Sequence, residues 1–414
     1  MTRLSSVLTS VSTSTFRTRG RGVALAACLA LLAACGTTTV AEPSRPAQAV
    51  QPQTSTPLEP FGTGGVDRFG RPILEERTQV ALLLPLSGRG EAVGQSMLNA
   101  AQMALFDSGV DTLELMPRDT TETPQGAAAA ARAAIGEGAD LVIGPLFGDH
   151  VPAVRTVAQP ANVNVISFST DRSVAGGNVF LFGFLPADQV DRVVEYAIGQ
   201  GMTRFAALVP SGAYGQAVAN ALQDSAAQRG ATARVEYFDP SNTDYSDAVR
   251  RVSQGGPIDA LMLPVTGLPL RGIAPLLDYY EIDAQLLGTG LWDIPGIGRE
   301  PALNGAWFAS PQPDLRAGFE QRYQAAFGEP PERLATLAYD AVALAAELTR
   351  SAPRGQPKFD TATLQDPAGY VGIDGIFRFG PDNLAQRGLA ILEVTPSGPV
   401  VLEPGAQSFA GPAF

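Results

Sequence analysis

His150 is the single histidine of the 414-residue sequence, and this limits the catalytic chemistry that the chain can perform. Together with Asp149 it could form a general acid and base pair. The sequence has no G-x-S-x-G nucleophile elbow that would supply a hydrolytic nucleophile. A metal centre built from several histidines is excluded, and the carboxylates do not fall at the spacing of a metal-binding loop. These residues favour a protein that is not an enzyme and that has no metal or cofactor.

Three closely spaced glycines follow the apolar run at 80–86, as glycines do in nucleotide-binding loops. Gly88, Gly90 and Gly94 are spaced G-x-G-x-x-x-G, which is one residue too long for the dinucleotide fingerprint. No Walker A sequence occurs in the chain. A nucleotide cofactor is therefore not expected.

Both cysteines lie in the apolar segment near the N-terminus. Arginines up to Arg21 precede an apolar run over 23–34, which is too short to span a bilayer but has the length of a secretory signal. The run ends in Leu-Ala-Ala-Cys-Gly, which resembles the bacterial lipobox and places a lipid on Cys35. We therefore expect a lipoprotein signal peptide over 1–34, removed together with Cys28. The alternative is an ordinary secretion signal with an incidental cysteine.

Without this segment the chain is strongly acidic. It keeps 25 basic and 41 acidic residues, a formal charge of −16, which argues against nucleic-acid binding. Residues 35–77 are rich in Pro, Thr and Gln and show no apolar period, so we expect a disordered tether that links a lipid anchor to a folded part.

From Gln79 onward, short apolar runs alternate with helical patterns. In one helical pattern, apolar side chains recur with helical spacing from Val190 to Ile198, after Pro186 and Asp188 as start signals. Another apolar stripe runs over 334–348. Alternating strands and helices predict an α/β fold with parallel sheets, and their number favours two doubly wound lobes. The expected buried strands cover 80–86, 141–146, 163–168, 205–210 and 259–265.

The loops after these strands are the candidate binding site, because doubly wound sheets bind ligands beyond the carboxyl ends of their strands. Free backbone N–H groups near Ser87 would suit an anion, Arg89 adds a cation, and Trp292 could stack on a ligand. Ordinary turn and packing roles are the alternative for each loop. The candidate cleft residues are Ser87, Gly88, Arg89, Gly148, Asp149, Ser167, Ser169, Thr170, Tyr214, Thr266, Trp292 and Asp293.

Several motifs in order resemble type I periplasmic binding proteins, the leucine/isoleucine/valine-binding protein-like superfamily. They include "VALLLPLSGRGEAVG", "DLVIGPLFGDHV", "VNVISFST", "ALVPSGAYGQ" and "LAYDAVALAAEL". The resemblance implies two lobes joined by a hinge. The N-terminal lobe would comprise 78–186 plus 311–350, and the C-terminal lobe 187–310 plus 351–414.

Two branches of that superfamily compete. The motifs, the lipobox and the tether look closer to the penicillin-binding protein activator lipoproteins. That resemblance implies a non-catalytic lipoprotein of the outer membrane that faces the periplasm and stimulates a class A penicillin-binding protein, a peptidoglycan synthase. The alternative is the substrate-binding component of a branched-chain amino-acid-type ABC transporter, with a small ligand such as an amino acid.

The comparison with amino-acid receptors concerns four residues. Ser169 and Thr170 fit the receptors' serine-threonine turn. Asp293 could provide the carboxylate that faces an α-amino group from the far lobe. Asp149, however, follows Gly148 where the receptors have a hydroxyl, and an acid there would repel an α-carboxylate. The activators, in turn, carry a helical-repeat domain for which 35–77 is too short.

Overall fold

The computed structural model describes residues 77–353 and 355–409. The expected signal peptide, the lipidation site Cys35 and all of the expected tether except Arg77 lie outside the described residues. Within the described residues, no helix has both the length and the apolar composition needed to cross a membrane.

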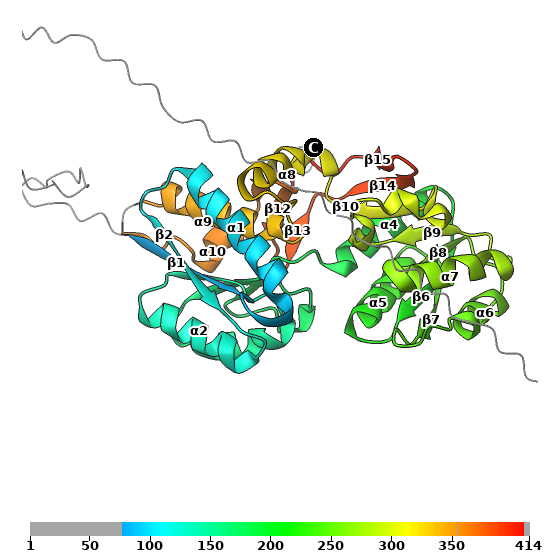
Figure 1. Cartoon of the computed structure of the whole chain (residues 1–414), viewed down its shortest axis with the longest axis horizontal. Helices are drawn as coiled ribbons and strands as arrows, with labels where there is room; N and C mark the ends of the chain where they lie inside the picture. The colour runs from blue at the N-terminus through cyan, green and yellow to red at the C-terminus, as the bar shows by residue number, and fades with distance from the viewer. Residues whose placement is uncertain (1–76, 354, 410–414) are drawn as a thin grey trace, which may run out of the picture. The chain divides into compact units, whose positions relative to one another are not determined.

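The first lobe is built on a parallel sheet of five strands in the order β2-β1-β3-β4-β5. Side chains of β1 alternate between two cores, so that Leu82 faces one side and Leu83 the other. Helices α1 (Glu91–Ser108) and α9 (Ala335–Ser351) cover the first side, and α2 (Pro124–Gly136) and α3 (Val151–Ala158) cover the second (Figure 1). The strands are β1 (Thr78–Leu84), β2 (Leu113–Asp119), β3 (Leu141–Ile143), β4 (Asn164–Ser167) and β5 (Val179–Leu181).

The second lobe has a seven-stranded sheet in the order β15-β14-β10-β9-β8-β6-β7. Its five parallel strands are β6 (Arg204–Pro210), β7 (Thr232–Phe238), β8 (Ala260–Met262), β9 (Gln285–Gly288) and β10 (Trp307–Ser310). Two antiparallel strands, β14 (Ala390–Thr395) and β15 (Gly398–Glu403), complete the sheet. One core contains side chains of α4 (Pro186–Gly199) and α5 (Ala213–Gln228), and the other those of α6 (Ser246–Gln254) and α7 (Gly267–Tyr279).

The α/β fold with two parallel-sheet lobes is therefore confirmed, and each apolar run that predicted a strand overlaps one. One boundary differs from the expectation. Residues 351–414 were assigned to the C-terminal lobe, but Phe359, Phe377 and Phe379 pack in the core of the first lobe. The ring of Phe379 lies 5.2 Å from that of Phe180 on β5, in an edge-on contact.

These aromatic residues belong to a small antiparallel sheet and its surroundings. The sheet consists of β11 (Tyr370–Gly372), β12 (Gly375–Phe379) and β13 (Ala385–Arg387), and the short helix α10 (Thr361–Leu364) precedes it. Helix α8 (Pro313–Phe327) also packs on the first lobe, through Phe319 and Tyr323 against Ala100 of α1. The apolar side chains between α9 and β13 pack in the core of the first lobe. The chain therefore returns to the sheet of the second lobe only at β14.

A matching glycine in each lobe lets the first helix approach the strand before it. A Cβ atom at Gly94 of α1 would lie 1.9 Å from the carbonyl oxygen of Pro85, and one at Gly215 of α5 would lie 1.8 Å from that of Pro210. Only glycine fits such an approach. The strand-to-helix loops are thereby held tightly at the carboxyl ends of β1 and β6.

Candidate functional site

A cleft of about 1190 Å³ is lined by residues of both lobes. The first lobe contributes the loops after β1, β3 and β4 and the start of α9, and the second contributes the starts of α4, α5 and α7 and the loop after β9. The lobes thus meet at the edges where the parallel strands end, as the general rule for doubly wound sheets predicts. Seven sequence candidates line the cleft, namely Arg89, Gly148, Asp149, Ser169, Thr170, Tyr214 and Thr266. That they contact a ligand stays a prediction.

A second hollow of about 1200 Å³ adjoins the cleft along α4 and α5 and shares five residues with it, Thr170, Asp171, Pro186, Ala213 and Tyr214. Its wall is charged and includes Asp188, whose pKa burial raises to about 6 against the attraction of Arg172. The first cleft is the better candidate site, because it contains most of the sequence candidates and a larger apolar share.

Ser87 and Gly88 shape a loop instead of lining the cleft. The Ser87 hydroxyl donates to Oδ2 of Asp119 at 2.6 Å, and the Leu86 N–H donates to Oδ1 of the same carboxylate at 2.9 Å. Burial favours the neutral carboxyl, but these hydrogen bonds outweigh it and lower the pKa of Asp119. Gly88 has a φ of +78°, a value that suits glycine. Ser87 thus fastens the loop after β1 to the end of β2, and neither Ser87 nor Gly88 lines the cleft.

The serine-threonine turn after β4 is likewise held by internal hydrogen bonds. The buried Ser167 hydroxyl donates to the carbonyl oxygen of Pro145 at 2.9 Å and accepts the N–H of Ser169 at 3.1 Å. The Ser169 hydroxyl in turn accepts the N–H of Asp171 at 3.0 Å. Ser167 does not line the cleft, whereas Thr170 is exposed there. The turn therefore presents Thr170 and supports it from beneath.

Tyr214, in the first turn of α5, is held in place by a hydrogen bond within the second lobe. Its hydroxyl lies 2.8 Å from Oγ1 of Thr289, and burial raises the pKa of Tyr214 to about 12 although this hydrogen bond opposes the rise. The phenol is consequently neutral at ordinary pH, and its ring forms part of the cleft wall. Thr266 lies at the N-cap position of α7 on the same wall.

The expected stacking role of Trp292 does not hold. The indole is fully buried in the core of the second lobe, packs edge-on against Phe308 and donates Nε1–H to the carbonyl oxygen of Val265 at 2.9 Å. The side chains of Leu291 and Ile294, each 41 % exposed, line the cleft in its place. The sequence pattern of this loop pointed to Trp292 and Asp293 as candidates and gave no signal for these two apolar side chains.

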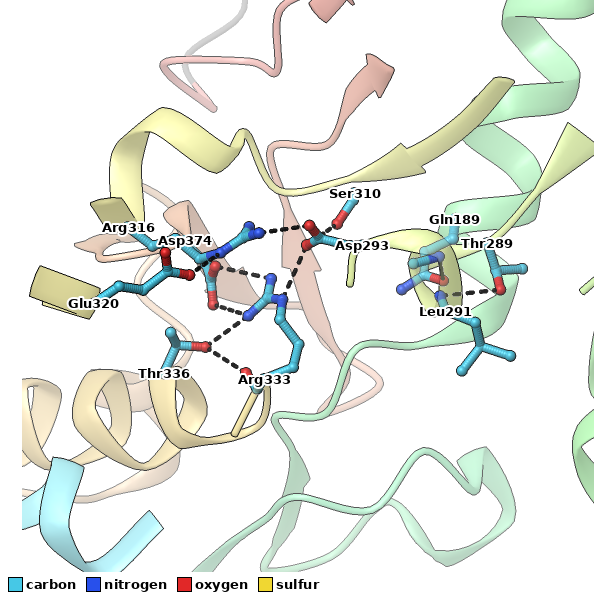
Figure 2. Close-up of polar contacts among 11 residues, drawn as sticks. Gln189, Thr289, Leu291, Asp293, Ser310, Arg316, Glu320, Arg333, Thr336 and Asp374 are labelled. Carbon is cyan, nitrogen blue, oxygen red and sulfur yellow. Dashed lines mark hydrogen bonds and ion pairs between the residues drawn. The ribbon is translucent and has the colours of Figure 1, made fainter. Parts of the chain in front are cut away.

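Asp293 is also absent from the cleft wall, because three side chains surround its carboxylate (Figure 2). Oδ2 accepts from the Ser310 hydroxyl at 2.8 Å and from Nε of Arg333 at 2.9 Å, and Oδ1 accepts from Nη2 of Arg316 at 2.5 Å. Asp293 is 3 % exposed. The proposed contact of this carboxylate with a ligand amine is therefore replaced by two ion pairs.

These ion pairs join the two lobes. Asp293 follows a turn of the second lobe, whereas Arg316 on α8 and Arg333 before α9 belong to elements that pack on the first. Arg333 also holds Asp374 with Nη2 and Nη1 at 3.0 and 3.2 Å, and its guanidinium lies 4.3 Å from the ring centre of Phe184. Burial would lower the pKa of Arg333, but Asp374 and Asp293 reverse the effect and raise it. We call Asp293, Ser310, Arg316, Arg333 and Asp374 the Asp293 network.

A buried carboxyl group lies next to this network. Asp340 accepts the N–H of Ile373 at 2.7 Å through Oδ1, but Oδ2 has no hydrogen-bond partner among the described residues. Burial, followed by the negative charge of Asp374, raises the pKa of Asp340 to about 7. Asp374 is equally buried, but the attraction of Arg333 and then Arg387 lowers its pKa. At neutral pH one of the two carboxyl groups therefore carries a proton for much of the time.

The histidine offers little for catalysis. His150 is 2 % exposed and packs edge-on against Phe147 with 5.4 Å between ring centres. Its Nε2 is 3.9 Å from Oδ1 of Asp149, which is too long for a hydrogen bond. Among the described residues, no group of three or more His, Cys, Asp or Glu side chains could hold a metal ion.

Two lobes with the same strand order and a cleft between them define a type I periplasmic binding protein. The chain belongs to the family described as "Periplasmic binding protein", whose model matches residues 77–399. The expected superfamily is thereby confirmed, and so is the expectation that the chain is a binding protein and not an enzyme.

Curated relatives match only in part. The chain is 23 % identical over 185 residues to "Uncharacterized protein RP748" of Rickettsia prowazekii, covering 44 % of this chain and 49 % of that protein. It is 28 % identical over 143 residues to "Penicillin-binding protein activator LpoA" of Glaesserella parasuis, covering 34 % of this chain and 24 % of that protein. The chain thus spans about half the length of the first relative and about a quarter of the second.

Solved structures match over most of the chain. A putative branched-chain amino acid ABC transporter protein from Rhodospirillum rubrum has a TM-score of 0.69 at 21 % identity, covering 79 % of this chain and all of that one. A solute-binding protein from R. palustris in complex with benzoate has a TM-score of 0.60 at 17 % identity, covering 82 % of this chain and 99 % of that one. Identities this low establish the fold alone.

Replacing Asp293 by Asn tests the Asp293 network. We expect the free energy of unfolding to fall by about 3–5 kcal/mol, because the buried Arg316 and the largely covered Arg333 lose their shared counter-charge. Urea denaturation measures this loss. Asp247→Asn is the matched control, since Asp247 forms an exposed pair with Arg250 and should lose at most about 1 kcal/mol. Equal losses in both variants would contradict a joining role for Asp293.

Replacing Asp340 by Asn tests the buried carboxyl group. The folded protein holds the Asp340 proton up to about pH 7, whereas an unfolded aspartate releases it near its ordinary pKa of 3.8. Between these values the folded state binds more protons, so its stability falls as the pH rises. Relative to Asp340→Asn, the wild type should lose on the order of 1 kcal/mol per pH unit in that window. Denaturation curves from pH 4 to 7 measure the difference, in which the shared contribution of Asp188 cancels. A constant difference across the window would refute the assignment.

Proposed function

We propose that this chain is a receptor that captures a small solute between its lobes, as the substrate-binding component of an ABC transporter of the branched-chain amino-acid type. The observation that carries the proposal is the apolar surface on opposing walls of the cleft. Phe147 of the first lobe is 36 % exposed, and Leu291 and Ile294 of the second are each 41 % exposed. A ligand between the walls would remove all three side chains from water.

The size and composition of the cleft support this role. Its volume of about 1190 Å³ is somewhat above that of typical ligand pockets, which measure about 300–1,000 Å³ and are mostly apolar with a few polar groups. Polar groups here come from the exposed Thr170 and from Tyr214 and Thr266. Binding between two lobes also couples ligand capture to hinge closure, which a transporter can recognise.

The proposed location is the periplasm, with a lipid on Cys35. The Leu-Ala-Ala-Cys-Gly sequence supports the anchor, and Gly36 after the cysteine supports the outer membrane as its site. A chain from Gly36 to Arg77 would then separate the binding lobes from the lipid.

A second candidate is the activator role, which sequence analysis placed first. The similarity to the LpoA protein supports it, together with the lipobox and the expected tether. That similarity covers a third of the chain, whereas the likeness to solute-binding proteins covers about four fifths. The receptor is therefore the preferred proposal, and a class A penicillin-binding protein is the alternative partner.

Replacing Leu291 by Glu tests the receptor proposal. We expect a small solute to raise the free energy of unfolding of the wild type by about 2.7 kcal/mol at 100 times its Kd. Leu291→Glu should weaken that solute's binding at least about tenfold, because it places a charge on an apolar wall. Thermal shift over a panel of amino acids, amines and aromatic acids measures both effects. Leu268→Glu is the matched control, since Leu268 is 77 % exposed outside the cleft. Equal weakening by both variants would argue against binding in the cleft.

Affinity capture distinguishes the two candidates. The receptor proposal predicts that purified protein retains no class A penicillin-binding protein from solubilised membranes and leaves its glycan polymerisation unchanged. A retained synthase whose polymerisation rate rises on addition of the protein would favour the activator instead.

A further inference from the structure

We infer that the cleft selects an apolar ligand that carries a protonated amine and no carboxylate, an inference that rests on the proposed receptor function. It follows from the charged side chains of the cleft that have no arginine or lysine partner among the described residues, which are the carboxylates of Asp149 and Asp171. The ligand class differs from the zwitterionic amino acids for which Asp293 had been considered a contact.

The wall from the second lobe is uncharged. Asp188 and Asp293 each adjoin a residue of this wall in the chain, but Asp188 lines the adjoining hollow, and the two arginines and Ser310 occupy the carboxylate of Asp293. The side chains that line this wall are neutral, and they include Gln189, Tyr214, Thr266, Leu291 and Ile294. A ligand amine therefore has no carboxylate to meet on the second lobe.

The cleft also lacks an unpaired cation among the described residues that line it. The Nε atom of Arg89 lies 3.4 Å from Oε1 of Glu122. The guanidinium of Arg333 is shared between Asp293 and Asp374. A ligand carboxylate would have to compete with carboxylates of the protein for either arginine, and at Arg333 it would have to do so in a buried setting.

Two carboxylates of the first lobe, in contrast, line the cleft and have no arginine or lysine partner in the part of the chain that the structure describes. The Asp149 side chain is 74 % exposed, and among the described residues the one basic side chain within 4.0 Å of its carboxylate is the imidazole of His150, at 3.9 Å. Asp171 is exposed and binds only the N–H and hydroxyl of Ser173. Both flank Gly148, where a Cβ atom would lie 3.8 Å from Oδ2 of Asp171. This wall therefore repels a ligand carboxylate and attracts a cation.

A neutral ligand fits less well than a cation. Covering the cleft with an apolar molecule would remove water from Asp149 and Asp171, and an ionised carboxylate that loses water without a counter-charge is costly. A protonated amine compensates this loss. Its apolar body would contact Leu291 and Ile294, and the face of Phe147 offers a further attraction for a cation.

Calorimetric titration of the purified full-length protein with matched compounds tests the inference. The probes are phenethylamine, phenylalanine and phenylpropionate, and isoamylamine, leucine and isocaproate, each series keeping one apolar body and changing only the charged groups. We expect each amine to bind at least about tenfold more tightly than the matched acid and amino acid, and its affinity to fall as salt is added.

Variants locate the charges. Asp149→Asn with Asp171→Asn should weaken amine binding at least about tenfold, whereas Asp111→Asn, at an exposed acid of the same lobe outside the cleft, should leave it unchanged. An acid or amino acid that binds as tightly as its amine would overturn the inference and leave the receptor proposal standing. Absence of binding by every probe at millimolar concentration would also overturn it. The receptor proposal itself fails only if the wider solute panel is silent as well.

Discussion

One buried carboxylate, that of Asp293, determines how the rest of the binding region is arranged. It pairs with Arg316 and Arg333, which stand on elements of the other lobe. An ion that loses its water must find close partners or the folded state becomes unstable. The carboxylate comes from the second lobe and its two guanidinium partners come from elements of the first, so the charges are balanced only when the lobes are in contact. The walls of the cleft lie on either side of this contact. Arg333 extends the arrangement to Asp374 and, through the proximity of that carboxylate, to the protonation of Asp340.

The same pairing explains the character of the cleft. With Asp293 and Arg333 engaged, Asp149 and Asp171 are the charged groups among the described residues of the cleft that have no arginine or lysine partner, and both belong to the first lobe. The second lobe offers neutral groups and the apolar side chains of Leu291 and Ile294. The family supplies the general mode of binding between lobes, and the local charge balance supplies the preference for a particular ligand.

Sequence patterns were sufficient for the fold and for the general place of the site. Buried parallel strands are continuous apolar runs, and the rule of the carboxyl edge needs no side-chain detail, so seven candidate residues lie in the cleft. Side-chain direction was the part that patterns could not predict. Trp292 and Leu291 are neighbours in one turn, yet one fills a core and the other faces the cleft. Whether Asp293 faces the cleft depends on arginines 23 and 40 residues away in the chain. The apolar side chains around Phe377 pack in the core of the first lobe, but their sequence pattern would suit either core.

Gly94 and Gly215 can be compared together with the strand orders of the two sheets. Counting along the chain, the parallel strands of both lobes follow the same arrangement, second-first-third-fourth-fifth, and each glycine stands at the equivalent point after the first strand of its lobe. Such correspondence is consistent with an ancestral half-size gene that was doubled and whose copies have since drifted beyond recognition in sequence. A ligand held between the lobes would then face two related walls, and an asymmetric molecule can be accommodated there because the two copies no longer carry the same charges.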